Sequence, residues 1–303
     1  MIYKLYPEFK DYLWGGNRLK TEYGKVTDKT PCAESWELSF HKDGQTKIAD
    51  GRTLAEVVTD EDKGENCKKF RFFPTLIKFI DAERNLSVQV HPSDEYALKN
   101  ENSFGKTECW YIADAAEGAG IYCGFARDTS ETEFLRYLAD GKVEELLNFI
   151  PVKKGECYFI AAGTLHAIGA GCLVYEVQQN SNLTYRVYDY GRRGADGKLR
   201  ELHIDKAVKV INYKKYLPVT FTDANSGVAQ TIAECEYFRL RKLTVKGGYS
   251  AVNGGSFTCV TAVDGFGTIN GERFSKGDSY FVTAKQKFTV AGAATVLLTD
   301  VPD

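Results

Sequence analysis

Residues 86–92 read Leu-Ser-Val-Gln-Val-His-Pro, and this alternation of valine with polar side chains predicts a β-strand. Side chains two residues apart on a strand leave the same face, so Ser87, Gln89 and His91 would lie together. The plainer interpretation is a polar strand face. The sharper one is a metal site, because neutral imidazole is a common metal ligand and a rigid strand holds a second donor two residues away without a supporting loop.

Most of the chain favours strands. Eighteen tyrosines, 18 phenylalanines and 28 glycines are spread through short runs broken by turns, which is typical of a mostly β architecture. Strand patterns occur at residues 33–39, 72–81, 105–112, 121–125, 155–169 and 173–179, and a short strand is expected within 12–19. Between residues 129 and 150 apolar residues recur at helical spacing behind Ser130, a plausible N-cap. This predicts two short helices inserted in the β framework, as a lid or as a buttress.

Charge and cysteine usage exclude several classes of protein. A net charge of -2 offers no basic surface for nucleic acid, and no apolar run approaches the length that spans a membrane. Residues 1–7 lack the charged and apolar segments of an export signal, so we expect a cytoplasmic protein. Eight cysteines without a C-x-x-C pair are then expected to be buried free thiols.

Several titratable residues lie inside apolar strand patterns. Lys78 interrupts the run 72–81, where it either reaches out along an edge or points into a ligand cavity. Glu34 and Glu37 lie either on a half-buried edge strand or as a pair facing a cavity. Glu108 shares a strand face with Lys106. His166 follows a glycine bend, from which its imidazole can reach the preceding hairpin.

The chain contains one internal similarity. Residues 276–284 align with residues 154–162, and the alignment continued without a gap places Phe288 over His166. No histidine occurs from residue 219 to the end of the sequence. We therefore expect a metal-binding catalytic domain over residues 1–217, with the helical insertion at about 129–150. After the likely boundary at Pro218, residues 218–303 would form a degenerate copy without metal ligands.

The stretch from Gly155 to His166 resembles the second motif of the cupin barrel, a jelly-roll-type β fold, with Ala161 in place of the usual proline. Gln89 and His91 lie where the first cupin motif has two histidines, and Glu108 on the next strand can supply a carboxylate. The expected fold is a double cupin of two β-barrels. His91, Glu108 and His166, with Gln89 as a fourth donor, would suit zinc, although manganese or iron would also accept these ligands.

A more specific resemblance covers almost the whole chain. Residues 33–39, 86–92, 105–108, 162–166 and 180–186 resemble the class I mannose-6-phosphate isomerases, in the short bacterial form. The resemblance implies one zinc ion per chain. It assigns the zinc ligands to Gln89, His91, Glu108 and His166. It places an active-site arginine at Arg186. The positions implied around the sugar phosphate are Ser87, Lys78, Lys106 and Glu176, with Arg192 where the long form has a basic residue.

The implied reaction interconverts mannose 6-phosphate and fructose 6-phosphate through a cis-enediol, whose oxygens need a fixed positive charge. Arg186 would supply a permanent cation, and Glu176 and Lys106 are candidates for the proton carrier. Charge-assisted donors for the phosphate would come from Arg192, Lys106 and Ser87. His41 and His203 are interpreted as surface or structural residues.

Two other functions fit parts of the sequence. One is an iron-dependent cupin dioxygenase, although lysines and arginines around the metal favour an anionic ligand. The other is a non-catalytic cupin that senses a sugar phosphate, although no DNA-binding segment accompanies it. The oligomeric state is left open.

Overall fold

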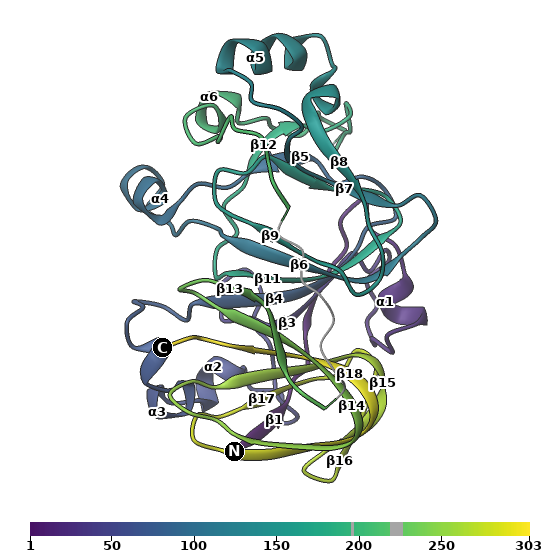
Figure 1. The fold of residues 1–303 in the computed structure, drawn as a ribbon, viewed down its shortest axis with the longest axis vertical. Helices are drawn as coiled ribbons and strands as arrows, with labels where there is room; N and C mark the ends of the chain where they lie inside the picture. The colour runs from purple at the N-terminus through teal and green to yellow at the C-terminus, as the bar shows by residue number, and fades with distance from the viewer. Residues whose placement is uncertain (195–196, 219–226) are drawn as a thin grey trace.

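The computed structural model describes residues 1–194, 197–218 and 227–303, and β-strands dominate them, as predicted. The strands form three antiparallel sheets stacked as layers, which we call the upper, central and C-terminal sheets (Figure 1). In spatial order the central sheet contains β2 (Glu8–Lys10), β3 (Glu34–Leu38), β4 (Thr75–Asp81), β11 (Cys172–Gln179), β6 (Glu108–Ala115) and β9 (Cys157–Ile160).

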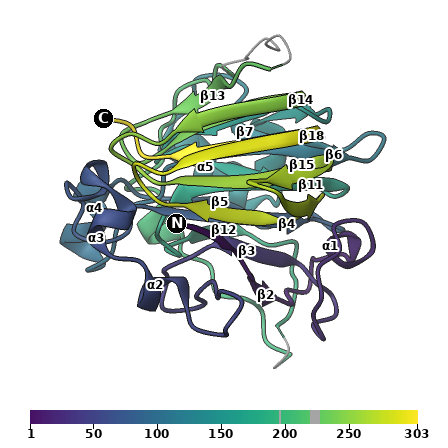
Figure 2. The ribbon, with the colours of Figure 1, turned by 90° about the horizontal axis from the view of Figure 1, so that it is seen from below.

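The other two sheets flank the central one. The upper sheet runs β12 (Tyr185–Tyr188), β5 (Val88–Val90), β10 (His166–Ile168), β7 (Gly120–Phe125) and β8 (Leu147–Pro151). The C-terminal sheet runs β1 (Ile2–Lys4), β17 (Ser279–Val282), β15 (Thr258–Ile269), β18 (Lys287–Asp300), β14 (Arg239–Val252) and β13 (Gln230–Glu234), with β16 (Glu272–Ser275) beside β15. Figure 2 shows the long strands β14, β18 and β15 side by side.

The layers form a cupin-like sandwich, and the expectation of closed barrels is corrected. A barrel closes only when its first and last strands pair. Among the described residues, β12 and β8 instead remain the two edges of the upper sheet, and β2 and β9 those of the central sheet.

Both faces of the central sheet are buried, and alternation along each strand decides on which face a side chain lies. Ile77 and Phe79 of β4 face the C-terminal sheet and share a hydrophobic core with Phe257 and Phe281. Lys78, between them in sequence, points the other way and lines a cavity below the upper sheet. The polar side chains of the central sheet therefore gather between the central and upper sheets.

The helices are short. They are α1 (Arg18–Thr21), α2 (Leu54–Val57), α3 (Asp60–Lys63), α4 (Asp94–Asn100), α5 (Glu131–Ala139) and α6 (Ile204–Ala207), with 3₁₀ turns at Glu65–Cys67 and Val143–Leu146. No helix among the described residues has both the length and the apolar character needed to cross a membrane.

The insertion at 129–150 contains one helix and not the expected two. Ser130 caps α5 as predicted, since its side chain accepts a hydrogen bond from the backbone of Glu133. After the 3₁₀ turn the chain becomes extended at Leu147 and pairs with β7 as strand β8. Sheet pairing thus overrides the helical spacing of the apolar residues. Phe134 packs against Phe125 of β7 in a core that also contains Val88 and Val90 of β5. Figure 1 shows α5 on the side of the upper sheet away from the central sheet, which favours a buttress over a lid.

The segment 12–19 was expected to contain a strand, and it instead forms turns followed by α1. Its close approach to the central sheet depends on glycine: a Cβ on Gly15 would lie 2.2 Å from Cβ of Ala33, and one on Gly16 would lie 2.4 Å from a carboxylate oxygen of Asp81. This approach brings Tyr12 to the cavity.

The aligned repeats adopt the same local structure. β9 and β17 occupy equivalent positions in the two copies, and each follows a glycine with positive φ, Gly155 or Gly277. Phe288, aligned with His166, lies in the core of the C-terminal sheet. The division at residue 217 is less simple than expected, because β1 pairs with β17 of the C-terminal sheet. The segment 219–226, beside the expected boundary, lies outside the described residues.

Candidate active site

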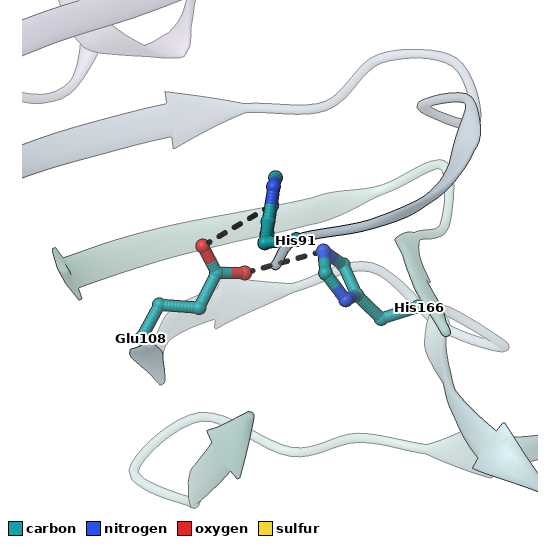
Figure 3. A group of neighbouring side chains, drawn as sticks. All are labelled: His91, Glu108 and His166. Carbon is teal, nitrogen blue, oxygen red and sulfur yellow. Dashed lines mark ion pairs between the residues drawn. The ribbon is translucent and has the colours of Figure 1, made fainter. Parts of the chain in front are cut away.

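Three buried side chains converge between the upper and central sheets (Figure 3). His91 follows β5, His166 begins β10, and Glu108 begins β6 on the facing sheet. One carboxylate oxygen of Glu108 lies 3.6 Å from His91 Nε2, and the other lies 3.4 Å from His166 Nε2. All three ligand atoms lie within 4.8 Å of one another. The sequence therefore correctly predicted that these three residues come together.

The chemistry of this trio fits a divalent cation. Each histidine donates its Nδ1–H to a backbone carbonyl, of Leu183 or of Thr164, at 2.8 Å. This leaves both Nε2 lone pairs directed toward Glu108, whose oxygens have no hydrogen-bond partner of good geometry among the described residues. Three acceptor groups facing one another in a buried space require a positive charge between them.

Burial also keeps the histidines ready to bind a metal. It lowers the pKa of His166 to about 4 and that of His91 well below its ordinary value, so both rings are neutral near pH 7. Burial raises the pKa of Glu108 to about 7, although the nearby Lys106 ammonium opposes this shift. Lys106 Nζ lies 2.5 Å from Glu108 and 3.3 Å from His91 Nε2, so it is the cation closest to the trio.

Gln89, the fourth metal ligand that the sequence predicted, lies beside the trio. It pairs directly with His166 on one side and with Arg186 on the other, across β10, β5 and β12. Its side-chain nitrogen lies 3.4 Å from His166 Nε2, and the residue lines the cavity. An amide binds a metal through its oxygen, and Gln89 Oε1 instead accepts a hydrogen bond from the Ser87 hydroxyl at 3.5 Å, so ligation by Gln89 would need the amide to turn.

A row of charged side chains crosses the floor of the cavity. Lys78 and Glu176 are direct partners on β4 and β11 and lie 3.4 Å apart. Glu176 also accepts a hydrogen bond from the indole of Trp110 at 3.0 Å and lies 3.7 Å from Lys106. Lys78 is held 3.7 Å from Glu34 as well. Lys78 thus points into the cavity, which was one of the two alternatives for it.

Opposite charges fix the ionisation of this row. Burial alone would lower the pKa of Lys78, but the carboxylates of Glu34, Glu176 and Glu108 outweigh burial and raise it. Burial alone would raise the pKa of Glu176, but Lys106 and Lys78 outweigh it and lower that pKa to about 2. Lys78 and Glu176 are therefore both charged at neutral pH.

The interpretation of Glu34 and Glu37 as a pair facing the cavity is only half right. Glu34 lines the cavity, whereas Glu37 on the opposite strand face forms a 2.6 Å ion pair with Lys25. Alternation along β3 separates the two, and a register shift follows at Trp36/Leu38.

The cavity itself has a volume of about 290 Å³. The predicted residues among its lining are Lys78, Ser87, Gln89, Lys106, Glu176 and Arg186. Arg186 donates to the Ser87 hydroxyl at 3.3 Å. Arg192 lies outside the lining and instead bonds Asp189 and the carbonyl of Asn85.

The sequence reasoning missed other lining residues, namely Tyr12, Trp14, Trp110, Asn182, Thr184 and Arg200. Trp110 could have been found, because it alternates with Glu108 on the same face of β6. Arg200 comes from a non-repetitive loop that carries no periodic signal. His41 and His203 lie away from the metal ligands: His41 packs against Trp36, and His203 accepts from the backbone of Arg186.

Comparison with known families and proteins agrees with this geometry. The family model for the catalytic domain of phosphomannose isomerase type I matches residues 2–126, and that for the cupin domain of mannose-6-phosphate isomerase matches residues 229–300. Mannose-6-phosphate isomerase ManA of Bacillus subtilis is 38% identical over 285 residues, which cover 90% of each chain. A mannose-6-phosphate isomerase of Streptococcus mutans is 36% identical, over 88% of this chain and 87% of its own.

Solved structures show the same fold. The crystal structure of a mannose 6-phosphate isomerase from Bacillus subtilis matches with a TM-score of 0.89 and 34% identity, covering 98% of this chain and 99% of that one. The apo phosphomannose isomerase of Salmonella typhimurium matches with a TM-score of 0.81 over 100% of this chain and 99% of its own, at 17% identity. The second likeness concerns the fold alone.

Proposed function

The chain belongs to the type I phosphomannose isomerase family, and we propose that it interconverts mannose 6-phosphate and fructose 6-phosphate using one zinc ion per chain and a cis-enediol intermediate. The observation that carries the zinc proposal is the buried trio of His91, Glu108 and His166, whose ligand atoms face one another within 4.8 Å. Gln89 would be the fourth ligand.

Zinc suits this donor set, because it accepts mixed nitrogen and oxygen ligands and keeps a position open for a substrate oxygen. When bound, such an ion supplies positive charge that polarises the sugar oxygens near it. Manganese and iron accept the same ligands, so the proposal is tested by which metal restores activity.

The isomerisation moves a proton between C2 of the aldose and C1 of the ketose. We assign this transfer to the pair Lys106 and Glu176, which lie 3.7 Å apart and both line the cavity. The Trp110 indole holds Glu176 in place, and Lys78 provides its second counter-charge. Variants Glu176→Gln and Lys106→Met, with the metal content of each measured, would show which member of the pair carries the proton.

Arg186 would balance the negative charge that develops on the enediol oxygens. Its guanidinium stays protonated and reaches the same cavity from β12, beside the Gln89 ligand. Ser87, which accepts a hydrogen bond from Arg186, would donate its own hydroxyl to the sugar phosphate, and Lys106 would add a charged donor.

Proton exchange with solvent tests the reaction and its intermediate together. The purified protein would be given mannose 6-phosphate in D₂O, and the sugars followed by NMR. We expect fructose 6-phosphate to form and deuterium to enter C1 of fructose 6-phosphate and C2 of mannose 6-phosphate. Conversion over many turnovers with no deuterium in either sugar would favour a hydride shift over the enediol, and no conversion by the zinc-loaded protein would contradict the proposed activity.

A further inference from the structure

Two guanidinium groups line the cavity, but the second is not the one that the sequence suggested. Arg186 comes from β12, and Arg200 comes from the arm that follows it, whose described residues are 189–194 and 197–203. Arg192, in the same arm, donates to the carbonyl of Asn85 at 2.6 Å and lies outside the lining. The arm thus places Arg200 at the cavity, whereas Arg192 is hydrogen-bonded to the loop that contains Asn85.

A single buried carboxylate organises both arginines. Asp189, which directly follows β12, is only 5% exposed. Its Oδ1 accepts hydrogen bonds from Arg192, at 3.1 Å from Nε, and from Arg200, at 3.3 Å from Nη1. Its Oδ2 has no hydrogen-bond partner among the described residues. Arg200 is therefore anchored at one nitrogen by a carboxylate that the fold itself holds in place.

The arm also supports Arg186. The Arg186 guanidinium donates to the backbone carbonyl of Glu201 at 3.0 Å, and its backbone accepts and donates hydrogen bonds with His203. Glu201 and His203, which follow Arg200 in the chain, are thus bonded to Arg186. Each guanidinium is held by a hydrogen bond, that of Arg186 to the carbonyl of Glu201 and that of Arg200 to the carboxylate of Asp189.

The charge at this end of the cavity is unbalanced. Arg186, Arg192 and Arg200 carry three positive charges around the buried charge of Asp189 and the largely exposed charge of Glu201, so buried negative charge is short there. Burial and then the neighbouring Arg200 lower the pKa of Arg186 from its ordinary value, although Asp189 and Glu201 oppose this shift. A doubly charged phosphate ester would relieve that shortage, because the guanidinium group of Arg200 can bind phosphate oxygens in fixed geometry.

We propose that Arg200 is the guanidinium that binds the phosphate of the substrate, next to Arg186 at the reacting carbons, and that Asp189 is the positioning residue that fixes Arg200 there. This inference rests on the proposed function, since it takes the phosphate of the sugar as the ligand. It replaces Arg192, which then serves only to fix Asp189 and the arm.

Variants of the arm test the proposal through binding and turnover separately. For Arg200→Ala we expect the KM for mannose 6-phosphate and the dissociation constant of inorganic phosphate to rise about 10- to 100-fold, which is the range for loss of a charge-assisted hydrogen bond. The kcat should stay within about threefold, because phosphate contacts are kept from ground state to transition state. Arg193→Ala is the matched control: it removes the same charge from the same arm, at an exposed residue whose guanidinium donates to the carbonyl of Gly197.

The positioning role of Asp189 has its own readout. Asp189→Asn should raise the same two constants about 3- to 10-fold, and the double variant with Arg200→Ala should be no weaker than Arg200→Ala alone. Multiplying effects in the double variant would contradict a role that acts through Arg200. Circular dichroism melting would verify folding, and if Asp189→Asn does not fold, Arg200→Lys replaces it, because lysine keeps the charge and loses the rigid fork.

Two outcomes separate this inference from the proposed function. If wild-type protein binds inorganic phosphate in calorimetry, and Arg200→Ala does not, phosphate binding by Arg200 is supported even when mannose 6-phosphate is not turned over. If the wild type isomerises mannose 6-phosphate while Arg200→Ala matches Arg193→Ala in KM and phosphate binding, the inference is overturned and the function remains.

Discussion

At the scale of single residues, Glu108 connects the metal ligands with the charged row. Its carboxylate faces both histidines, and Lys106 lies 2.5 Å from one of its oxygens and 3.7 Å from Glu176. Because Glu108 is fully buried, each of these neighbours strongly affects its charge. A substitution at one ligand should therefore weaken metal binding more than it lowers the stability of the fold.

Replacing His166 with alanine should abolish metal binding and isomerase activity together, because the remaining His91 and Glu108 offer too few donors for a structured zinc site. Metal content by mass spectrometry and a coupled assay of mannose 6-phosphate turnover would measure both. His41→Ala is the control, since this histidine packs against Trp36 away from the trio. Full zinc occupancy in His166→Ala would show that the ligand set is wrong.

Replacing Arg186 with alanine should leave zinc bound but lower kcat by about 10²–10³-fold, which is typical for loss of a group that stabilises developing negative charge. Arg186 lies beside Gln89 on the neighbouring strand and belongs to none of the metal-binding positions. Steady-state kinetics of the zinc-loaded variant would measure the effect. An unchanged kcat, or loss of zinc along with activity, would speak against this role.

At the scale of elements, the sequence predicted best where strand alternation alone decides the structure. β4, β6, β10 and β11 were found as short apolar runs that carry few polar residues and are bounded by turns, and strand geometry brings Lys78, Glu108 and Glu176 to one face of the central sheet. Prediction from the sequence failed where tertiary contacts determine the structure. Residues 147–150 keep helical spacing but pair with β7, and Arg200 reaches the cavity through an arm held by Asp189.

The helix α5 supports the upper sheet, so its core contact should affect stability and not catalysis. Phe134→Ala should lower the free energy of unfolding by about 3–5 kcal/mol, as expected when a buried phenylalanine is truncated. The KM and kcat at 25 °C should stay within about twofold. Leu135→Ala, at a partly exposed position of the same helix, is the control for denaturant unfolding. A raised KM in Phe134→Ala would indicate that α5 acts as a lid.

At the scale of the whole molecule, the C-terminal sheet forms the back wall of the catalytic layers. Glu37 of β3 lies in this interface, where it accepts hydrogen bonds from Ser35 at 2.6 Å and from Ser279 of β17 at 2.8 Å. Lys25 neutralises it and donates to the carbonyl of Gly277. The two halves of the chain are thus joined by a buried polar network within a shared hydrophobic core.

Removing one charged partner from this network should lower the free energy of unfolding. Glu37→Gln leaves the charge of Lys25 buried and unpaired, so we expect a loss of about 3–5 kcal/mol in unfolding free energy, measured by denaturant titration. The double variant Lys25→Met with Glu37→Gln removes both charges and should recover most of that loss. Equal stability of Glu37→Gln and wild type would mean that the ion pair does not hold the halves together.

We propose that this isomerase works with one zinc ion held by His91, Glu108, His166 and Gln89. The most direct test is to strip the protein with a chelator and add zinc back in measured equivalents, following fructose 6-phosphate formation from mannose 6-phosphate. We expect the metal-free protein to be inactive and activity to rise linearly to a plateau at one zinc per chain. Full activity in protein shown to be free of metal, or no activity at one bound zinc per chain, would contradict the claim.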